Sequence, residues 1–113
     1  MNQYKHSPFD EEILDAIIKH NLNKPSSEKF TLVDVRVISL IHSYCYASMP
    51  FYASNQYLAE RCLTTPATIQ KSINRLLAHG LITKQVSCVD GRKQRILIYD
   101  EPGAEKFKRK YNP

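Results

Sequence analysis

The chain has no tryptophan, only three cysteines, and no apolar run that approaches the roughly 18–20 residues needed to span a membrane. The cysteines, Cys45, Cys62 and Cys88, are widely spaced and odd in number, which argues against a disulfide framework. They are typical of small reduced side chains in a cytosolic protein. Because the first residues, MNQYKHSPFDEE, are polar, we expect no secretory signal and a cytoplasmic location.

Catalytic and metal-binding patterns are missing as well. The sequence contains no glycine-rich phosphate loop, no HExxH and no GxSxG. His42 and Cys45 lie three residues apart, but no second pair at zinc spacing accompanies them, so we interpret both as buried side chains. We therefore expect neither an enzyme nor a cofactor, a metal or a small-molecule ligand.

What the chain does have is an uneven charge. Its formal net charge is +5 over 113 residues, a length that suits one domain. Residues 1–60 contain five basic and seven acidic side chains, whereas residues 61–113 contain eleven basic and four acidic ones. A basic half suits a polyanion, either a nucleic acid or an anionic membrane surface, and it is also compatible with a merely solvated surface.

Apolar spacing predicts two helices in the first half. The first covers Phe9 to Asn21 and is followed by a loop at residues 21–29. The second runs from Leu32 to about Ser48, and Thr31 and Asp34 form a capping pattern at its start. Its apolar side chains cover most of its circumference, so we expect it to be either the spine of the core or part of a dimer contact.

Two more helices and a hairpin follow. A short third helix covers Asn55 to Cys62 after the N-cap Ser54. A fourth helix opens at Thr65 and Pro66 and runs to about His79, where a glycine stops it. Residues 81–99 then alternate as two strands around an Asp-Gly turn, which is a strong hairpin signal.

The run LAERCLTTPATIQKSINRLLAHGLI at residues 58–82 is similar to the core of bacterial winged helix-turn-helix proteins. The matching positions are Leu58, Ala59, Thr65, Ile69, Ile73, Leu76, Gly80, Leu81 and Ile82. One position departs, because Leu63 and Thr64 stand where the family often has glycine and an apolar residue, so the shape of that turn stays open. The setting, an apolar helix ahead of Tyr-Ala-Ser-Asn-Gln, resembles the N-terminal domains of plasmid and phage replication initiators and replisome organisers.

This resemblance implies the fold class and the domain organisation. The expected fold is mainly α with a small β-hairpin, a winged helix-turn-helix. Residues 1–30 are expected to be an N-terminal helical extension, and residues 31–101 the winged helix-turn-helix domain. Residues 102–113 are expected to be a basic C-terminal tail, either frayed helix or disordered, that extends the footprint or is simply solvated.

The resemblance also implies where DNA would bind. The fourth helix would enter the major groove, and the wing would meet phosphates or the minor groove. Candidate contacts in the helix-turn-helix are Ser54, Gln56, Thr65, Ala67, Thr68, Gln70, Lys71, Asn74 and Arg75. Those in the wing are Lys84, Arg92, Lys93 and Arg95. The amides of Gln70 and Asn74 suit bidentate contact with adenine.

We therefore predict sequence-specific binding of double-stranded DNA. The expected role is that of a transcriptional regulator or of a replication or maintenance factor in a bacterial, plasmid or phage context. A homodimer is expected, because one recognition helix reads only a few base pairs. The alternative is a winged-helix protein-interaction module that does not bind DNA.

Overall fold

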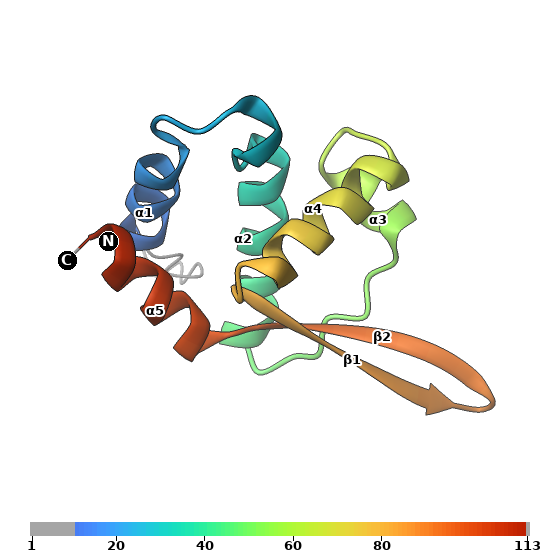
Figure 1. The fold of residues 1–113 in the computed structure, drawn as a ribbon. Coiled ribbons are helices and arrows are strands. Elements are labelled where there is room, and N and C mark those ends of the chain that lie inside the picture. Colours follow the sequence, from blue (N-terminus) through green and yellow to red (C-terminus); the bar gives the residue numbers. More distant parts are fainter. Residues whose placement is uncertain (1–10, 113) are drawn as a thin grey trace, which may run out of the picture.

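The computed structural model describes residues 11–112. In chain order its elements are α1 (Glu11–Asn21), a 3₁₀ turn (Ser26–Glu28), α2 (Leu32–Tyr46), α3 (Asn55–Arg61), α4 (Pro66–Ala78), β1 (Ile82–Val89), β2 (Arg92–Tyr99) and α5 (Glu101–Tyr111). The hairpin extends well beyond the helices, and α3 and α4 lie beside α2 (Figure 1). The predicted mainly α fold with a hairpin after a helix-turn-helix is confirmed.

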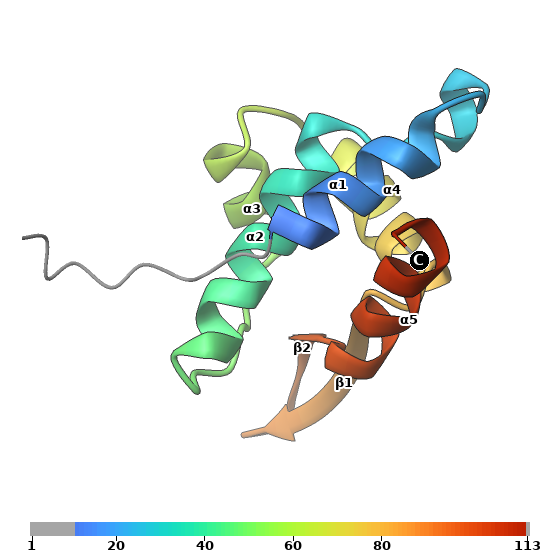
Figure 2. The same cartoon turned by 90° about the vertical axis from the view of Figure 1, so that its left-hand side faces the viewer.

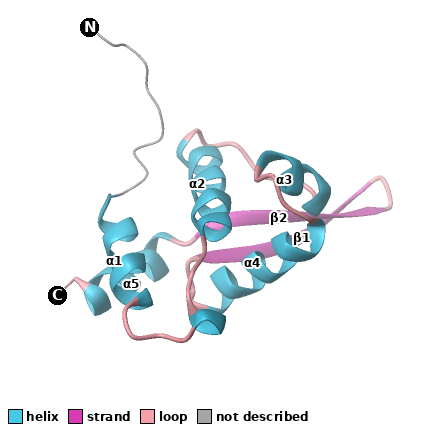
Figure 3. Ribbon diagram, turned by 90° about the horizontal axis from the view of Figure 1, so that it is seen from above, coloured by secondary structure: helices cyan, strands magenta, loops and turns pink. Residues whose placement is uncertain are grey.

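The core lies where all of these helices and strands meet. Each α-helix and each strand contributes at least one buried apolar side chain to a single cluster. Seen from above, the two strands run between α2 and α4, with β2 next to α2 and β1 next to α4, and α1 and α5 lie together at one end (Figure 3). In α2 the side chains of Val37, Ile38 and Ile41 are fully buried, so this helix is the spine of the core and its broad apolar face is used within the chain.

The start of α2 has the predicted capping geometry. The hydroxyl of Thr31 accepts the backbone N–H of Asp34 at 3.2 Å, and Asp34 Oδ2 accepts the backbone N–H of Thr31 at 2.7 Å. The helix ends at Tyr46, two residues before the predicted end. It ends there because Ser48 takes a left-handed conformation (φ 59°), which lets the N–H of Met49 close on the carbonyl of Tyr44 at 2.8 Å.

The turn between α3 and α4 has the backbone shape that suits glycine, although it carries Leu63. Leu63 has φ 55°, and the next N–H, of Thr64, donates to the carbonyl of Ala59 at 2.9 Å. The end of α4 closes in the same way around Gly80, which has φ 72°. The departure of this turn from the family pattern therefore lies in the side chain rather than in the backbone.

The hairpin closes with a two-residue turn. Val89 pairs with Arg92, and Asp90 and Gly91 between them have φ 53° and 76°, the signature of a type I′ turn. At its base, Leu97 donates its N–H to the carbonyl of Phe51 at 3.1 Å, just before α3. The hairpin is thereby fastened to the segment that leads into the helix-turn-helix.

The expectation of a frayed or disordered tail is wrong for Glu101–Tyr111, which forms α5. Asp100 caps this helix by accepting the N–H of Gly103 at 3.0 Å, and Pro102 lies in its first turn, where a missing N–H leaves no bond unmade. Phe107 is buried, and α5 packs against α1 (Figure 2), where Asn112 Nδ2 donates to the carbonyl of Glu12 at 3.0 Å. Pro102 and Gly103 thus belong to the first turn of this helix.

Candidate nucleic-acid interface

One side of α4 is buried and the other is open to solvent. Ile69, Ile73 and Leu76 are at most 1% exposed and hold the helix against the core. Of the predicted contact residues on this helix, Ala67, Gln70, Lys71 and Asn74 are exposed, and Thr68 and Arg75 are half-buried. The helix therefore presents two amides and one lysine on its open side.

The threonines at the start of α4 are engaged in building that start. Thr65 Oγ1 accepts the backbone N–H of Thr68 at 3.2 Å, and the two hydroxyl oxygens are 3.1 Å apart. Pro66 occupies the first helical position. These contacts fix the entry of the helix, and Ala67 beside them adds an exposed methyl group.

Arg75 faces the core side rather than the open side of α4. Its Nη1 lies 2.9 Å and 2.8 Å from the two carboxylate oxygens of Asp34, which is fully buried. The hydroxyl of Ser72 donates to the same carboxylate. These contacts join α4 to the start of α2 and give Arg75 a structural role.

The start of α3 brings two predicted contacts to the edge of α4. Ser54 caps the helix by accepting the N–H of Tyr57 at 3.1 Å. Gln56 is exposed and donates to Glu60 one turn later at 3.2 Å. Both residues lie next to Asn55, whose side chain reaches across to α4.

The basic side chains of the wing differ in their exposure to solvent. Lys84, Arg92 and Lys93 are exposed, whereas Arg95 is half-buried. The pairing register and the alternation of side chains place Lys84, Lys93 and Arg95 on one face of the hairpin. Because Arg95 contacts the start of α3, this is the face turned toward the helix-turn-helix.

A chain of hydrogen bonds joins the wing, α3 and α4. Arg95 Nη2 donates to the carbonyl of Ala53 at 2.8 Å, and its Nη1 donates to Asn55 Oδ1 at 2.8 Å. Asn55 Nδ2 donates to Gln70 Oε1 at 2.9 Å, and Gln70 Nε2 donates to Asn74 Oδ1 at 2.9 Å. Burial lowers the pKa of the Arg95 guanidinium below its ordinary value. These three elements therefore form one connected surface.

Asn55 is the residue of this surface whose role sequence reasoning missed. In the sequence it is one of three polar residues that open a short helix, where only its backbone N–H draws attention. Its partners Gln70 and Arg95 lie 15 and 40 residues further along the chain. No local pattern indicates such contacts.

The exposed cations of this surface are not paired within the described chain. Among residues 11–112, no acidic side chain lies within ion-pair distance of Lys71, Lys84, Arg92 or Lys93. On α5, by contrast, Lys108 pairs with Glu105 at 2.6 Å and with Glu12 of α1 at 3.6 Å. The surface of α4 and the wing therefore offers unneutralised positive charge to a ligand.

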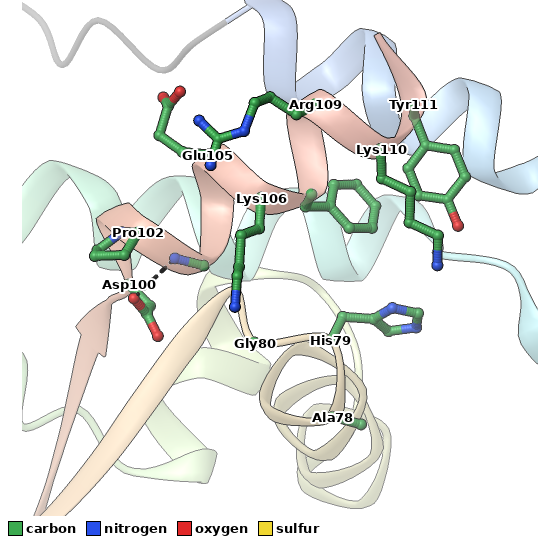
Figure 4. Close-up of a pocket in the computed structure, with 12 residues that line it drawn as sticks. Ala78, His79, Gly80, Asp100, Pro102, Glu105, Lys106, Arg109, Lys110 and Tyr111 are labelled. Atoms are coloured by element: carbon green, nitrogen blue, oxygen red, sulfur yellow. Dashed lines mark hydrogen bonds between the residues drawn. The ribbon is translucent and has the colours of Figure 1, made fainter. Parts of the chain in front are cut away.

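A cavity of about 700 Å³ lies between the end of α4 and α5 (Figure 4). Lys106 extends toward Gly80 there (Figure 4), and the ring of His79 lies 6.0 Å from that of Phe107, measured between centroids. Burial, followed by the nearby charges of His20, Lys110 and Arg75, lowers the pKa of His79, and Asp34 opposes that effect. The cavity lies at the opposite end of α4 from Pro66, so it is separate from the surface formed with the wing.

Other kinds of site find little support in the part of the chain described. Within residues 11–112 no three His, Cys, Asp or Glu side chains are grouped so as to hold a metal ion. Burial raises the pKa of the Cys62 thiol above its ordinary value of 9.0, against the smaller opposing effects of Arg36 and Arg61. None of the described helices combines the length and the apolar character needed to cross a membrane.

Comparison with known proteins identifies a family for the central part of the chain. Residues 31–82 match a family model described as a helix-turn-helix domain. The matched segment begins at the N-cap of α2 and ends at the first residue of β1, so it contains α2, α3 and α4. No curated protein and no solved structure gives a significant match to the chain.

Proposed function

We propose, on the premise that residues 31–82 are a helix-turn-helix domain, that the protein binds double-stranded DNA in a sequence-specific manner. In this proposal α4 enters the major groove and the wing lies along the adjacent backbone. The observation that carries it is the connected surface, in which Arg95 and Asn55 hold the wing and the open side of α4 in one fixed arrangement.

The charge of this surface supports a phosphate backbone as the partner. Lys71, Lys84, Arg92 and Lys93 are exposed and carry no acidic partner among the described residues. A cation without an intramolecular partner releases the counterions of a phosphate on contact, and that release drives non-specific affinity. Base selection then falls to the side chains on the open side of α4, above all Gln70 and Asn74.

The set of proposed contacts is smaller than the sequence suggests. Arg75 is held by Asp34, and Arg95 is held by Ala53 and Asn55, so neither is assigned to DNA here. The proposed contacts are Ser54, Gln56, Ala67, Thr68, Gln70, Lys71, Asn74, Lys84, Arg92 and Lys93. Thr65 is assigned to the cap of α4.

The proposed biological role is that of a site-binding factor in transcription or in plasmid or phage replication or maintenance. These roles place the bound site differently, at promoters in the first case and at replication origins or partition sites in the second. Sequencing the genomic fragments that the purified protein retains would distinguish them. Enrichment of promoter regions supports a regulator, and enrichment of origin repeats supports a replication factor.

A homodimer on DNA is part of the proposal, because one recognition helix reads only a few base pairs. The face of α2 is occupied by the core, so it is not the contact. Ile18 and Leu22 lie one helical turn apart near the end of α1 and are 60% and 63% exposed. Light scattering of the Ile18→Glu, Leu22→Glu variant tests them, because a monomeric variant of a dimeric wild type supports this contact and an unchanged mass excludes it.

The test of DNA binding is a titration of labelled duplexes across salt concentrations. For wild type we expect the logarithm of the binding constant to fall linearly with the logarithm of salt concentration. The Arg92→Ala, Lys93→Ala variant should reduce the slope by about two if both residues contact phosphate. The matched control is Lys106→Ala, Lys110→Ala, which removes the same charge from α5 and should leave the slope nearly unchanged.

Two results would contradict the proposal. Absence of binding to any duplex at low salt would favour the alternative of a protein-interaction module. Equal loss of slope in the wing variant and in the α5 variant would show that net charge, rather than the surface of α4 and the wing, attracts DNA.

A further inference from the structure

Arg95 determines which group donates and which accepts in each hydrogen bond between the wing and α4. A guanidinium group has only donors, whereas each side-chain amide has a donor end and an acceptor end. Arg95 can therefore face only the oxygen of Asn55, as it does at 2.8 Å. With its oxygen toward Arg95, Asn55 must turn its NH₂ group toward α4.

The same rule passes along the next two amides. The NH₂ group of Asn55 requires an acceptor, so Gln70 turns its Oε1 toward it at 2.9 Å. The NH₂ group of Gln70 then faces Asn74 Oδ1 at 2.9 Å, one turn further along α4. The last amide, Asn74, is exposed. Its oxygen accepts from Gln70, so its NH₂ group points away from this series of bonds.

We infer that Arg95 and Asn55 are specificity-determining positioning residues, which orient the amides of α4 so that Asn74 offers a hydrogen-bond donor to the base it meets. The inference rests on the DNA binding proposed above. A donor selects a base edge that accepts, and guanine offers two acceptors, N7 and O6, in the major groove. Asn74 is therefore assigned to guanine rather than to adenine.

The chemistry of the major groove explains the difference from adenine. Bidentate recognition of adenine uses the oxygen and the NH₂ group of one amide together. In Asn74 the oxygen already accepts from Gln70, which leaves the NH₂ edge for the base. Cytosine presents an amino donor at this position and would oppose the NH₂ group of Asn74.

The effect on binding is expected to be moderate. Asn55 is half-buried, but Gln70 and Asn74 are exposed, so water competes for these bonds in the free protein. When DNA covers the surface and excludes water, reversal of an amide leaves a donor or an acceptor unpaired. Because one such bond contributes a modest net free energy, we expect base discrimination of about three- to ten-fold from the orientation alone.

The sharpest test is the Asn55→Asp variant, which reverses the orientation of the Gln70 and Asn74 amides and keeps Arg95 in place. A carboxylate accepts only, so it keeps its bond with Arg95 and forces Gln70 to turn its NH₂ group toward α3. Gln70 then presents its oxygen to Asn74, which turns its own oxygen outward. Residue 55 is the first residue of α3, where a negative charge is favourable, so the variant should fold.

The measurement is selection from a pool of random duplexes followed by sequencing. For wild type we expect one position at which guanine is preferred, and Asn74→Ala should abolish the preference there, which identifies the contacted position. Asn55→Asp should move that position toward cytosine or adenine, whose amino groups donate. Arg61→Gln, an exposed change on α3 at a residue that is not a proposed contact, is the control for the same change in charge, and it should weaken binding to all sites without moving the preference.

Two substitutions of Arg95 complete the test. Arg95→Lys retains a group that only donates and should keep the guanine preference, whereas Arg95→Met lets the amides rotate and should reduce it about three- to ten-fold. In the free protein, Arg95→Met should also shift the side-chain NH₂ resonances of Gln70 and Asn74, although Arg95 touches neither.

The outcomes separate this inference from the function on which it rests. If wild type selects a consensus and Asn55→Asp leaves every position unchanged, the orientation by Asn55 is wrong while DNA binding stands. If wild type selects an adenine at the Asn74-dependent position, the assignment to guanine is wrong, and if it selects a cytosine, whose edge only donates, the donor assignment is wrong. If wild type binds no duplex, both the function and the inference fall.

Discussion

Arg75 and Asp34 form an ion pair across 41 residues of sequence, and the carboxylate is the most deeply buried charge among the described residues. Asp34 is fully buried and accepts from Arg75, from the Ser72 hydroxyl and from the backbone of Thr31. One side chain thus caps α2 and holds α4 against it. The sequence presents Arg75 as a flank of the recognition surface, and the structure uses it to hold α4 against the start of α2.

The first prediction separates stability from DNA binding at this pair. Arg75→Met leaves the buried Asp34 carboxylate without its cation, and we expect a loss of about 3 kcal/mol in the free energy of unfolding. The affinity of the folded variant for DNA should stay close to that of wild type. Urea unfolding and duplex titration measure the two quantities.

Lys71→Met is the matched control on the same helix. Lys71 is exposed and without an acidic partner among the described residues, so its loss should change the free energy of unfolding by less than about 0.5 kcal/mol. It should weaken DNA binding instead. The structural role of Arg75 would be refuted by a variant that unfolds like wild type but binds DNA poorly.

The second prediction concerns the turn between α3 and α4. Leu63 has φ 55° and is 94% exposed, so it bears a backbone conformation unfavourable for its side chain and has little packing to lose. Leu63→Gly should therefore raise the free energy of unfolding by about 0.5–1 kcal/mol, after the greater flexibility of glycine in the unfolded chain is included.

Leu63→Ala tests the same site without relieving the backbone. Alanine keeps a Cβ atom at φ 55°, so its stability should stay within about 0.5 kcal/mol of wild type. Thermal and urea unfolding compare the three proteins. Equal stability of the glycine and alanine variants would mean that the exposed leucine, and not the backbone, determines the effect.

The third prediction concerns the contact between α5 and the end of α4. A Cβ atom on Gly103 would lie 1.8 Å from the carbonyl oxygen of Gly80, which no side-chain rotation can relieve. Gly103→Ala would ordinarily stabilise a helix by about 1 kcal/mol. Here we expect the opposite sign, a loss of about 1–3 kcal/mol, because α5 must move away from Gly80.

The sign of that change is the decisive result. Limited proteolysis should also cut residues 101–112 of the Gly103→Ala protein faster than those of wild type, because α5 packs against α1 less well. Glu101→Ala, an exposed change in the same turn, should have neither effect. A stabilised Gly103→Ala protein would show that α5 does not depend on the close approach to Gly80.

Local sequence signals predict part of this fold but not all of it. Ser54, Thr65, Pro66 and Gly80 act locally, within one helical turn, and they predict the bounds of α3 and α4 nearly to the residue. The hairpin is predicted in the same way from its Asp-Gly turn. Local signals fail where a partner lies far along the chain. Gly103 lies close to the carbonyl of Gly80, 23 residues earlier in the chain, and no local pattern indicates that contact.

The same limit applies to the candidate site. Periodicity identifies the open side of α4, because burial follows the helical repeat. It does not distinguish an arginine that faces solvent from one that reaches a buried carboxylate, as Arg75 does. The bond from Arg95 to Asn55 spans 40 residues and depends on how the hairpin leaves the core, which no local pattern determines.

The last prediction concerns pH and the aromatic cluster that joins α1, α4 and α5. The ring of His79 lies 5.0 Å from His20 and 4.7 Å from Phe30, measured between centroids. Burial lowers the pKa of His79 below 6.5, and the charges of His20, Lys110 and Arg75 lower it further against Asp34. The unfolded chain therefore binds this proton more readily than the folded chain does.

Stability should consequently be fully present above pH 6.5 and should decline as the pH falls through 6.5 toward the lower pKa of the folded state. Thermal unfolding between pH 7.5 and pH 5.5 measures the decline. His79→Phe retains a ring in the cluster but cannot be protonated, so its melting temperature should depend less on pH over this interval. An equally steep decline in His79→Phe would show that protonation of His79 does not cause the pH dependence. The loss of stability would then be assigned to other titratable groups, because the variant lacks this imidazole and still shows it.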